Sequence, residues 1–358
     1  MNINATSILT FAVMLSAICT ILGQGYSKRS TIASVEILVV SGLGLGTLLA
    51  PLPLSRYFLI GVLGYAAYSL FKSHATGTIK IISLAQLALA ILLALVSTFM
   101  GNSLALYAGI FLTVTLVPLV PFHLPFASLV SSAQGASSGL WLTVFFSLGF
   151  AELSELHPFL SQKLSTPVSL LALGSALYGS FKCLGQNQIR SLLAYATIAQ
   201  VSMLWGLTTV FSSFPQWGVS FGLTIALVMT GLLVTFHCVQ ERLGPHMLGT
   251  LPGLASRMPR LGTMLIILIS IAILLPIIPI LTGLTTMPTT DTQDVPLIII
   301  SLIILSVWMF GSWYFAQVLH QTAFGKPRPD IPYIDLKTAE ICSLALLIAG
   351  ASYSGLFY

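Results

Sequence analysis

Long runs of apolar residues, separated by short polar segments, recur along the whole chain. A helix needs roughly 20 residues to cross about 30 Å of hydrocarbon. The candidate runs are residues 5–22, 33–52, 57–71, 81–99, 102–122, 135–151, 166–181, 191–212, 218–240, 261–284, 296–322 and 338–357. They lack the alternation of polar and apolar residues that is typical of membrane barrels, and open sheet edges are not tolerated in lipid. The pattern therefore predicts an all-α polytopic membrane protein with about twelve transmembrane helices.

Composition supports a membrane protein and argues against several functional classes. Hydrophobic residues make up 56% of the chain and charged residues 6%, whereas soluble proteins average roughly 25% charged residues. The basic residues are scattered through short loops, so nucleic acid binding is not expected. The four cysteines lie far apart without metal-ligand spacing, and we interpret them as small buried residues. We expect one membrane domain over residues 1–358, with a retained first span and no metal site.

The distribution of Lys and Arg predicts the orientation of the helices. If the first span starts outside and every span reverses direction, twelve of the 14 basic residues lie on one side. Only Arg56 and Lys163 lie on the other side. The side rich in positive charge faces the cytoplasm in most membranes, or the equivalent compartment of an organelle. This asymmetry also supports the run at 81–99 as a true crossing.

Two spans carry the same proline motif in their interior. Pro118 and Pro121 lie in the fifth run, and Pro276 and Pro279 in the tenth. Proline removes a backbone donor and kinks a helix, and broken helices in equivalent halves are typical of transporters with internal repeats. The spacing predicts two broken helices, although proline is common enough in membrane helices for coincidence to remain an alternative.

Several motifs in register resemble the antiporter-like, proton-translocating subunits of respiratory complex I, membrane-bound hydrogenases and Mrp cation antiporters. They are QNQIRSLLAY from Gln186 to Tyr195, PLVPFH from Pro118 to His123, QER at 240–242 and PGLASRM at 252–258. The resemblance implies two inverted repeats, each with a broken helix. We expect them at about 57–156 and 165–322, followed by a C-terminal helix at 337–358. The first span matches the third helix of the family, which implies an N-terminally shortened member.

The resemblance also implies that charged positions of the family have been lost. In the family, buried Glu, Lys and His residues conduct protons along the middle of the membrane. The matching positions here are neutral: Gly61, Leu116, Ser147, Ile225 and Leu284, with Gln200 near a further histidine position. Buried charges in membranes are normally kept for ion movement or pairing. Their replacement indicates a degenerate subunit that has lost the original transport.

A few polar residues remain as candidates for an ion path. Arg190 matches a family Lys, although a position at the start of a helix favours snorkelling of its side chain to the basic side. Lys182 flanks the same short loop. His237 and Glu241 are four residues apart and share a helix face, where they could pass a proton or form a structural hydrogen bond. Ser147 and Gln200 could orient water.

Other polar residues are interpreted as structural. Glu36 is expected in the first turn of its helix, where a carboxylate interacts favourably with the helix dipole. Glu152, Glu155 and His157 are expected in a solvated loop beyond a helix end. His123 belongs to the broken-helix motif, but no acid follows it there.

We therefore predict a structural scaffold subunit of a larger complex I-related membrane complex, not catalytic alone. Its partners would be other antiporter-like membrane subunits and lipids, and redox cofactors would lie in partner subunits rather than in this chain. The alternative is an active carrier of protons, cations or inorganic carbon that uses residual polar groups and water. The expected location is a bacterial inner membrane or an energy-transducing organelle membrane.

Overall fold

The structure, a computed structural model, consists of helices joined by short connections. It describes residues 5–24, 30–73, 77–99, 102–133, 135–211, 214–244, 248–250, 252–281, 294–327 and 333–356. Leu284 lies outside the described residues. The helices are α1 (Ala5–Gly23), α2 (Ser30–Leu49), α3 (Leu54–Lys72), α4 (Thr78–Phe99), α5 (Asn102–Leu116), α6 (Leu124–Ser132), α7 (Ser137–Lys163), α8 (Ser165–Leu184), α9 (Ile189–Val210), α10 (Phe214–Leu243), α11 (Leu254–Arg257), α12 (Pro259–Leu274), the 3-10 turn η1 (Leu275–Ile277), α13 (Ile278–Leu281), α14 (Asp294–Thr322) and α15 (Thr338–Leu356).

The helices confirm the predicted all-α membrane fold. Within the described residues, nine helices are long and apolar enough to cross a membrane, and Ser34–Leu49 and Ala105–Leu116 form shorter apolar helices. Each of the predicted apolar runs overlaps one of the helices above. The chain is an integral membrane protein. The inverted relation between its two halves stays a prediction.

One predicted loop is wrong. The residues after the apolar run 135–151 are not a solvated loop, because α7 continues through Pro158 to Lys163 and α8 begins at Ser165. Proline is tolerated in membrane helices because neighbouring groups can satisfy the carbonyl that it leaves free. Glu152, Glu155 and His157 are consequently helical residues of α7 rather than loop residues.

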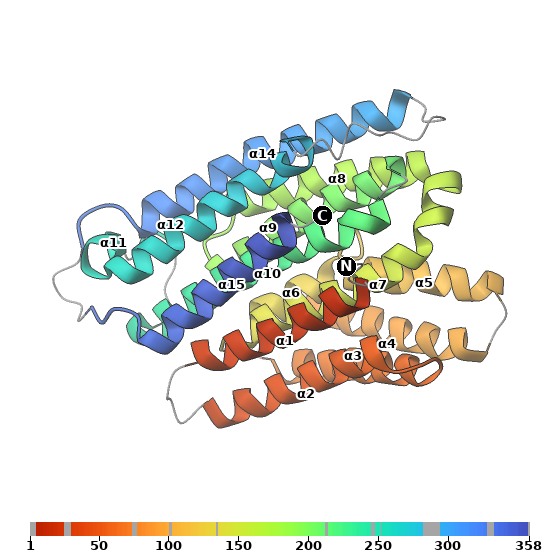
Figure 1. The fold of residues 1–358 in the computed structure, drawn as a ribbon, viewed down its shortest axis with the longest axis horizontal. Coiled ribbons are helices and arrows are strands. Elements are labelled where there is room, and N and C mark those ends of the chain that lie inside the picture. The colour runs from red at the N-terminus through yellow and green to blue at the C-terminus, as the bar shows by residue number, and fades with distance from the viewer. Residues whose placement is uncertain are drawn as a thin grey trace.

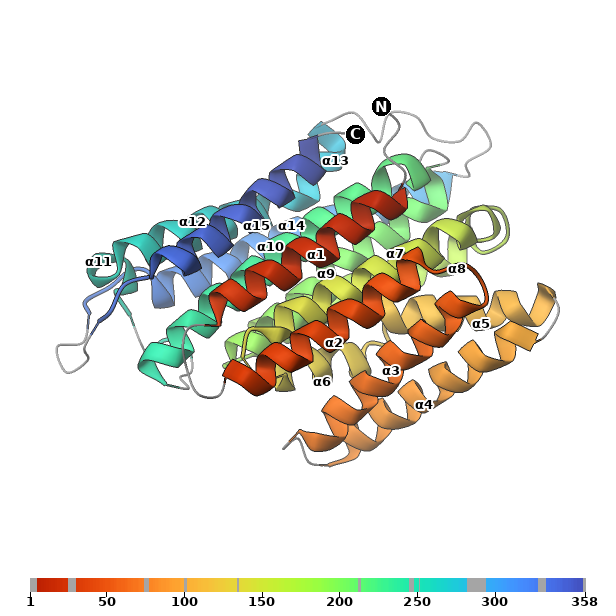
Figure 2. The same cartoon turned by 60° about the horizontal axis from the view of Figure 1, so that its bottom comes forward.

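Two helices form the centre of the molecule. In the most apolar part of each helix, 94% of the residues of α9 and 100% of those of α10 are buried. In α3 and α4 the share of buried residues is only 28%. Figures 1 and 2 show α9 and α10 surrounded by the other helices, with the α3–α4 hairpin at the periphery. Three of the cysteines are buried as predicted, but Cys342 on α15 is exposed.

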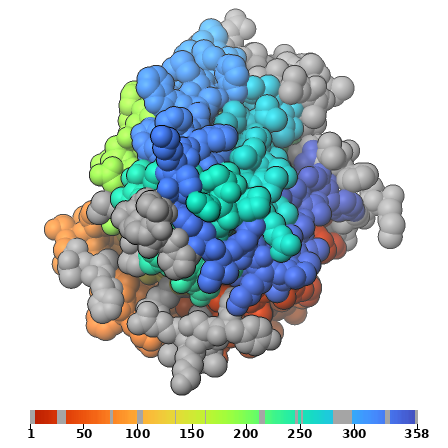
Figure 3. Space-filling model, turned by 90° about the vertical axis from the view of Figure 1, so that its left-hand side faces the viewer, coloured from red at the N-terminus to blue at the C-terminus, as the bar shows by residue number. Residues whose placement is uncertain are grey.

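Polar contacts join helix ends on the side that the charge distribution predicts to be basic. At the basic side, the Gln24 side chain after α1 lies 3.3 Å from the Ser34 hydroxyl of α2. The Asp335 carboxylate accepts hydrogen bonds from the backbone N–H groups of Arg260 and Leu261, which caps the start of α12. Figure 3 shows this end, with the orange α3–α4 region at one edge and the blue and cyan helices across the centre.

The α8–α9 contact illustrates how closely the helices approach one another. A Cβ atom at Gly179 of α8 would lie 3.0 Å from the carbonyl oxygen of Tyr195 and from the backbone nitrogen of Ala199 in α9. Lipid tails are as apolar as leucine, so close packing of small residues helps to hold membrane helices together. Glycine at position 179 therefore allows the backbones of α8 and α9 to approach this closely, because it has no side chain.

Replacing this glycine should destabilise the fold. We expect Gly179→Ala to lower the melting temperature in mild detergent, because overpacking costs about 1–3 kcal/mol. Gly174→Ala on the same helix is the matched control, since a Cβ there meets nothing within 4 Å. Equal melting temperatures for the two variants would contradict the close contact between α8 and α9 at Gly179.

Candidate functional site

The first broken helix lies between α5 and α6. Pro121 has no N–H to donate to the carbonyl four residues earlier, that of Val117. The indole Nε1 of Trp205 on α9 donates to this carbonyl at 3.1 Å. Nearby, the backbone N–H of Val120 donates to the hydroxyl of Ser175 on α8 at 2.9 Å. The break is thus closed by neutral side chains from two neighbouring helices.

The second broken helix repeats this arrangement. The α-helical geometry of α12 ends at Leu274, and the chain passes through η1 before α13. Pro276 cannot donate to the carbonyl of Ala272. The side-chain amide of Gln200 on α9 donates to that carbonyl at 2.9 Å. One central helix therefore supplies a donor at each proline motif, and α-helical geometry is interrupted at both motifs.

The positions matched to the charged residues of the family carry no charge in the described structure. Leu116, Ser147 and Ile225 are fully buried, with no exposed surface. Gly61 of α3 faces Leu43 of α2, which would lie 3.1 Å from an added Cβ atom. Their correspondence to the charged positions of the family stays a prediction.

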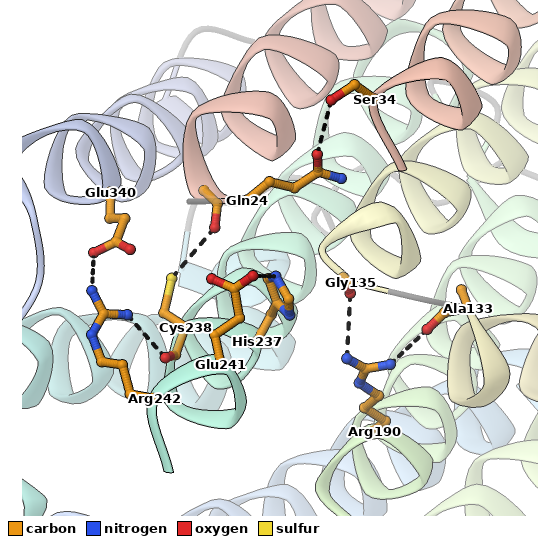
Figure 4. A network of polar contacts seen from close by, with 11 residues as sticks. Gln24, Ser34, Ala133, Gly135, Arg190, His237, Cys238, Glu241, Arg242 and Glu340 are labelled. Carbon is orange, nitrogen blue, oxygen red and sulfur yellow. Dashed lines mark hydrogen bonds and ion pairs between the residues drawn. The ribbon is translucent and has the colours of Figure 1, made fainter. Parts of the chain in front are cut away.

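A polar network lies at the basic side, beside the connection between α6 and α7 (Figure 4). Arg190, the second residue of α9, donates to the carbonyl oxygens of Ala133 at 2.6 Å and Gly135 at 3.3 Å. Free snorkelling was the favoured interpretation for Arg190, and it is wrong. The guanidinium instead holds the loop that follows α6, because the last carbonyls of a helix have no partner within it.

His237 and Glu241 of α10 adjoin this loop. The imidazole Nε2 and the carboxylate are 3.5 Å apart, which confirms that the two side chains share a helix face. A Cβ atom at Gly135 would lie 3.8 Å from His237 and 3.9 Å from Gln24. The tertiary structure thus brings Arg190, His237 and Glu241 to one place. Lys182 is not among them, because its ammonium lies over the Tyr178 ring on α8, 5.8 Å from the ring centre.

The strongest ion pair of this network was not predicted. Arg242 Nη2 lies 2.5 Å from a carboxylate oxygen of Glu340 on α15. The Glu340 carboxylate also accepts from the backbone N–H of Lys337, and the residue is only 2% exposed. Arg242 belongs to a family motif, and Glu340 is an acid in the first turn of the last helix. Those two features were the available signals, but sequence could not show that they meet.

Two acids assigned to simple structural roles have specific partners instead. Glu36 lies beyond the first turn of α2, so the dipole interpretation is wrong, and its carboxylate accepts from the Trp141 indole at 3.0 Å. Glu152 of α7 forms an ion pair with Arg56 of α3. His157 is buried against the carbonyl of Phe211, 3.0 Å away. Glu152 and His157 therefore make specific contacts with other parts of the chain, whereas Glu155 is exposed.

Comparisons with known proteins find relatives in sequence and in fold. No model of a protein family matches the chain. It is 27% identical over 251 residues to NADH-quinone oxidoreductase subunit M of Rickettsia typhi, which covers 67% of this chain and 50% of that subunit. It is 31% identical over 183 residues to NADH-ubiquinone oxidoreductase chain 4 of Myxine glutinosa, which covers 50% of this chain and 37% of the relative. The chain thus spans half or less of the length of these curated relatives.

Solved structures share the fold over nearly the whole chain. A chain of respiratory complex I from Thermus thermophilus matches with a TM-score of 0.70 and 18% identity, covering 99% of this chain and 81% of that one. A chain of the Mrp complex from Dietzia sp. gives 0.73 and 15%, with coverage of 98% and 79%. A chain of an archaeal membrane-bound sulfane sulfur reductase gives 0.78 and 14%, with coverage of 96% and 63%.

Sequence relatives, shared fold and two broken helices closed from one central helix point to the same conclusion. The chain resembles the antiporter-like membrane subunits of respiratory complex I and related complexes in sequence, and it shares their fold.

Proposed function

We propose that this chain is a structural antiporter-like subunit, which holds neighbouring membrane subunits in place and does not itself move protons. The observation that supports this most directly is the closure of both broken helices by uncharged donors. The side chains of Trp205 and Gln200 donate hydrogen bonds to the carbonyls that the prolines leave without a backbone partner. Neither of these donor side chains is titratable, so neither can pass a proton on.

The placement of charge supports the same proposal. The described ion pairs are Arg56–Glu152, His237–Glu241 and Arg242–Glu340. Two of them lie at the basic ends of helices, and the third joins the start of α3 to the outer half of α7. Paired charges at helix ends fix the helices relative to one another. A row of titratable groups along the middle of the membrane would be needed to pass protons from one site to the next.

The curated relatives are named as subunits of NADH oxidoreductases, and the similar solved chains come from multisubunit membrane complexes. We accordingly place this chain in a complex I-related assembly, beside other antiporter-like subunits. Redox cofactors would be held by those partners. The membrane would be that of a bacterial cell or of an energy-transducing organelle.

A second candidate function is an active carrier that conducts through water. Several buried polar atoms of the described residues have no protein partner: the Ser147 hydroxyl, the Gln200 Oε1 atom and both ring nitrogens of His123. Buried polar groups normally find a partner or an ordered water. Waters bound at these atoms could form part of a path for protons or cations.

The closure of the second break can be tested through stability. Gln200→Leu removes the donor to the Ala272 carbonyl, and an unpaired buried acceptor costs about 1–3 kcal/mol. We expect a lower melting temperature in mild detergent. Gln317→Leu, on the exposed face of α14, is the matched control and should leave the melting temperature nearly unchanged. An equally small effect of both variants would contradict the closure.

Assembly can be tested by purification. The tagged chain should co-purify in mild detergent with antiporter-like and redox subunits, identified by mass spectrometry after native gel separation. The scaffold proposal requires such partners, because a subunit without transport activity has no role alone. Isolation as a single-protein species from its native membrane would argue against it.

Transport can be measured directly. The purified chain in liposomes, with a potassium gradient and valinomycin to set the voltage, should show the proton leak of protein-free liposomes, followed with a pH-sensitive dye. A proton channel added at the end confirms that the vesicles respond. Flux above the leak that falls at least about tenfold in Ser147→Ala would favour the carrier and overturn the structural proposal.

A further inference from the structure

A small pocket opens at the basic end of α3, beside the last turn of α6. It has a volume of about 70 Å³ and is lined by Glu36, Tyr65, Tyr68, Ser69, Lys72, Ser73 and Ser132. These residues come from α2, α3, the end of α3 and the last turn of α6. A single water needs only about 10–15 Å³ by a comparable measure. The pocket therefore has room for a group larger than one water molecule.

The inner wall of the pocket carries an acidic side chain. The Glu36 carboxylate accepts one hydrogen bond, from the buried Trp141 indole. None of the ion pairs in the described part of the chain includes Glu36. A carboxylate can accept about four hydrogen bonds. This side chain therefore retains acceptor capacity, and Lys72, which lines the same pocket, is the nearby cation.

Aromatic rings connect this wall to the lipid-facing surface. The rings of Trp141 and Tyr65 are stacked 6.0 Å apart, and those of Tyr65 and Tyr68 are 5.9 Å apart. Tyr68 is 55% exposed. Aromatic faces attract cations, with the effect growing as water is removed. A cation entering from the membrane surface would thus pass along rings toward the Glu36 carboxylate.

The mouth of the pocket is positively charged. Lys72 is exposed in the last turn of α3. Beside it, the Lys80 ammonium donates to the carbonyl oxygens of Phe71 and Ser73 at 2.8 Å, which satisfies the end of this helix. Lysine and tyrosine gather where the hydrocarbon meets the headgroups. The mouth consequently lies at the depth of lipid phosphates on the basic side.

We propose that this pocket binds the headgroup of a phosphatidylethanolamine-type lipid. The primary ammonium would donate to the Glu36 carboxylate and lie against the tyrosine rings, while the phosphate would bind Lys72 at the mouth. The order of side chains, acidic inside and basic outside, matches an ammonium at the tip of the headgroup and a phosphate behind it. The site lies on the peripheral α3, where membrane lipid reaches the protein.

The same geometry predicts selectivity. A quaternary ammonium, as in phosphatidylcholine, has no N–H to donate to Glu36 and is larger than the primary amine. A glycerol headgroup, as in phosphatidylglycerol, carries no positive charge for the carboxylate. Both should bind more weakly than the ethanolamine lipid, although their phosphates can still contact Lys72.

The experiment is native mass spectrometry of the delipidated chain in mild detergent, titrated with short-chain phosphatidylethanolamine, phosphatidylcholine and phosphatidylglycerol. The ethanolamine lipid should bind tightest. Glu36→Gln, which keeps an acceptor for Trp141, should weaken its binding about tenfold, as expected for the loss of a hydrogen bond to a charged group. Lys72→Met should weaken all three lipids.

Matched variants separate this site from general charge effects. Glu155→Gln and Lys326→Met alter exposed residues away from the pocket and should leave lipid binding unchanged. Melting temperatures report whether each variant is folded. Equal binding of the three lipids, or unchanged ethanolamine-lipid binding in folded Glu36→Gln, would overturn the proposal. Displacement of the lipid by equimolar free phosphoethanolamine would also overturn it, because the pocket would then bind a soluble amine.

Discussion

The structure depends above all on the need to pair every backbone carbonyl inside the membrane. Hydrocarbon offers no hydrogen bonds, so a carbonyl that a proline leaves free must be satisfied by another part of the protein. This chain has two such breaks, and Trp205 and Gln200 of α9 satisfy one carbonyl in each. That requirement places α9 between the two broken helices and explains why it is almost entirely buried.

Close packing then holds the other helices around this centre. Added Cβ atoms would meet backbone of α9 at Gly179 and the Thr230 side chain of α10 at Gly139. The hydroxyls of Thr143 and Thr230 lie 2.9 Å apart across the α7–α10 contact. Small residues allow helix backbones to approach, and dispersion and hydrogen bonds replace the hydrophobic effect that lipid cannot supply. This close packing fits the proposed role of holding neighbouring subunits in place.

Charge is used sparingly and mainly between helices. Arg190 holds the loop after α6, and Arg242 with Glu340 joins α10 to α15. Glu36 differs from these, because its carboxylate lines a pocket in which Lys72 is the nearby cation. The proposed structural role and the proposed lipid site are therefore carried by different parts of the molecule. A static framework and a selective surface for its surrounding lipid are compatible in one subunit.

The sequence by itself determined the all-α class, the spans, the two breaks and the resemblance to antiporter-like subunits, because apolar length, proline and short motifs act locally along the chain. It also indicated the His237–Glu241 pair, since a helix repeats every 3.6 residues. Only the tertiary structure decided that Glu152 pairs with Arg56, that Glu340 pairs with Arg242 and that α9 closes both breaks. Those partners are 96, 98 and up to 88 residues apart. Such contacts depend on which helices become neighbours, and helix periodicity carries no information about that choice.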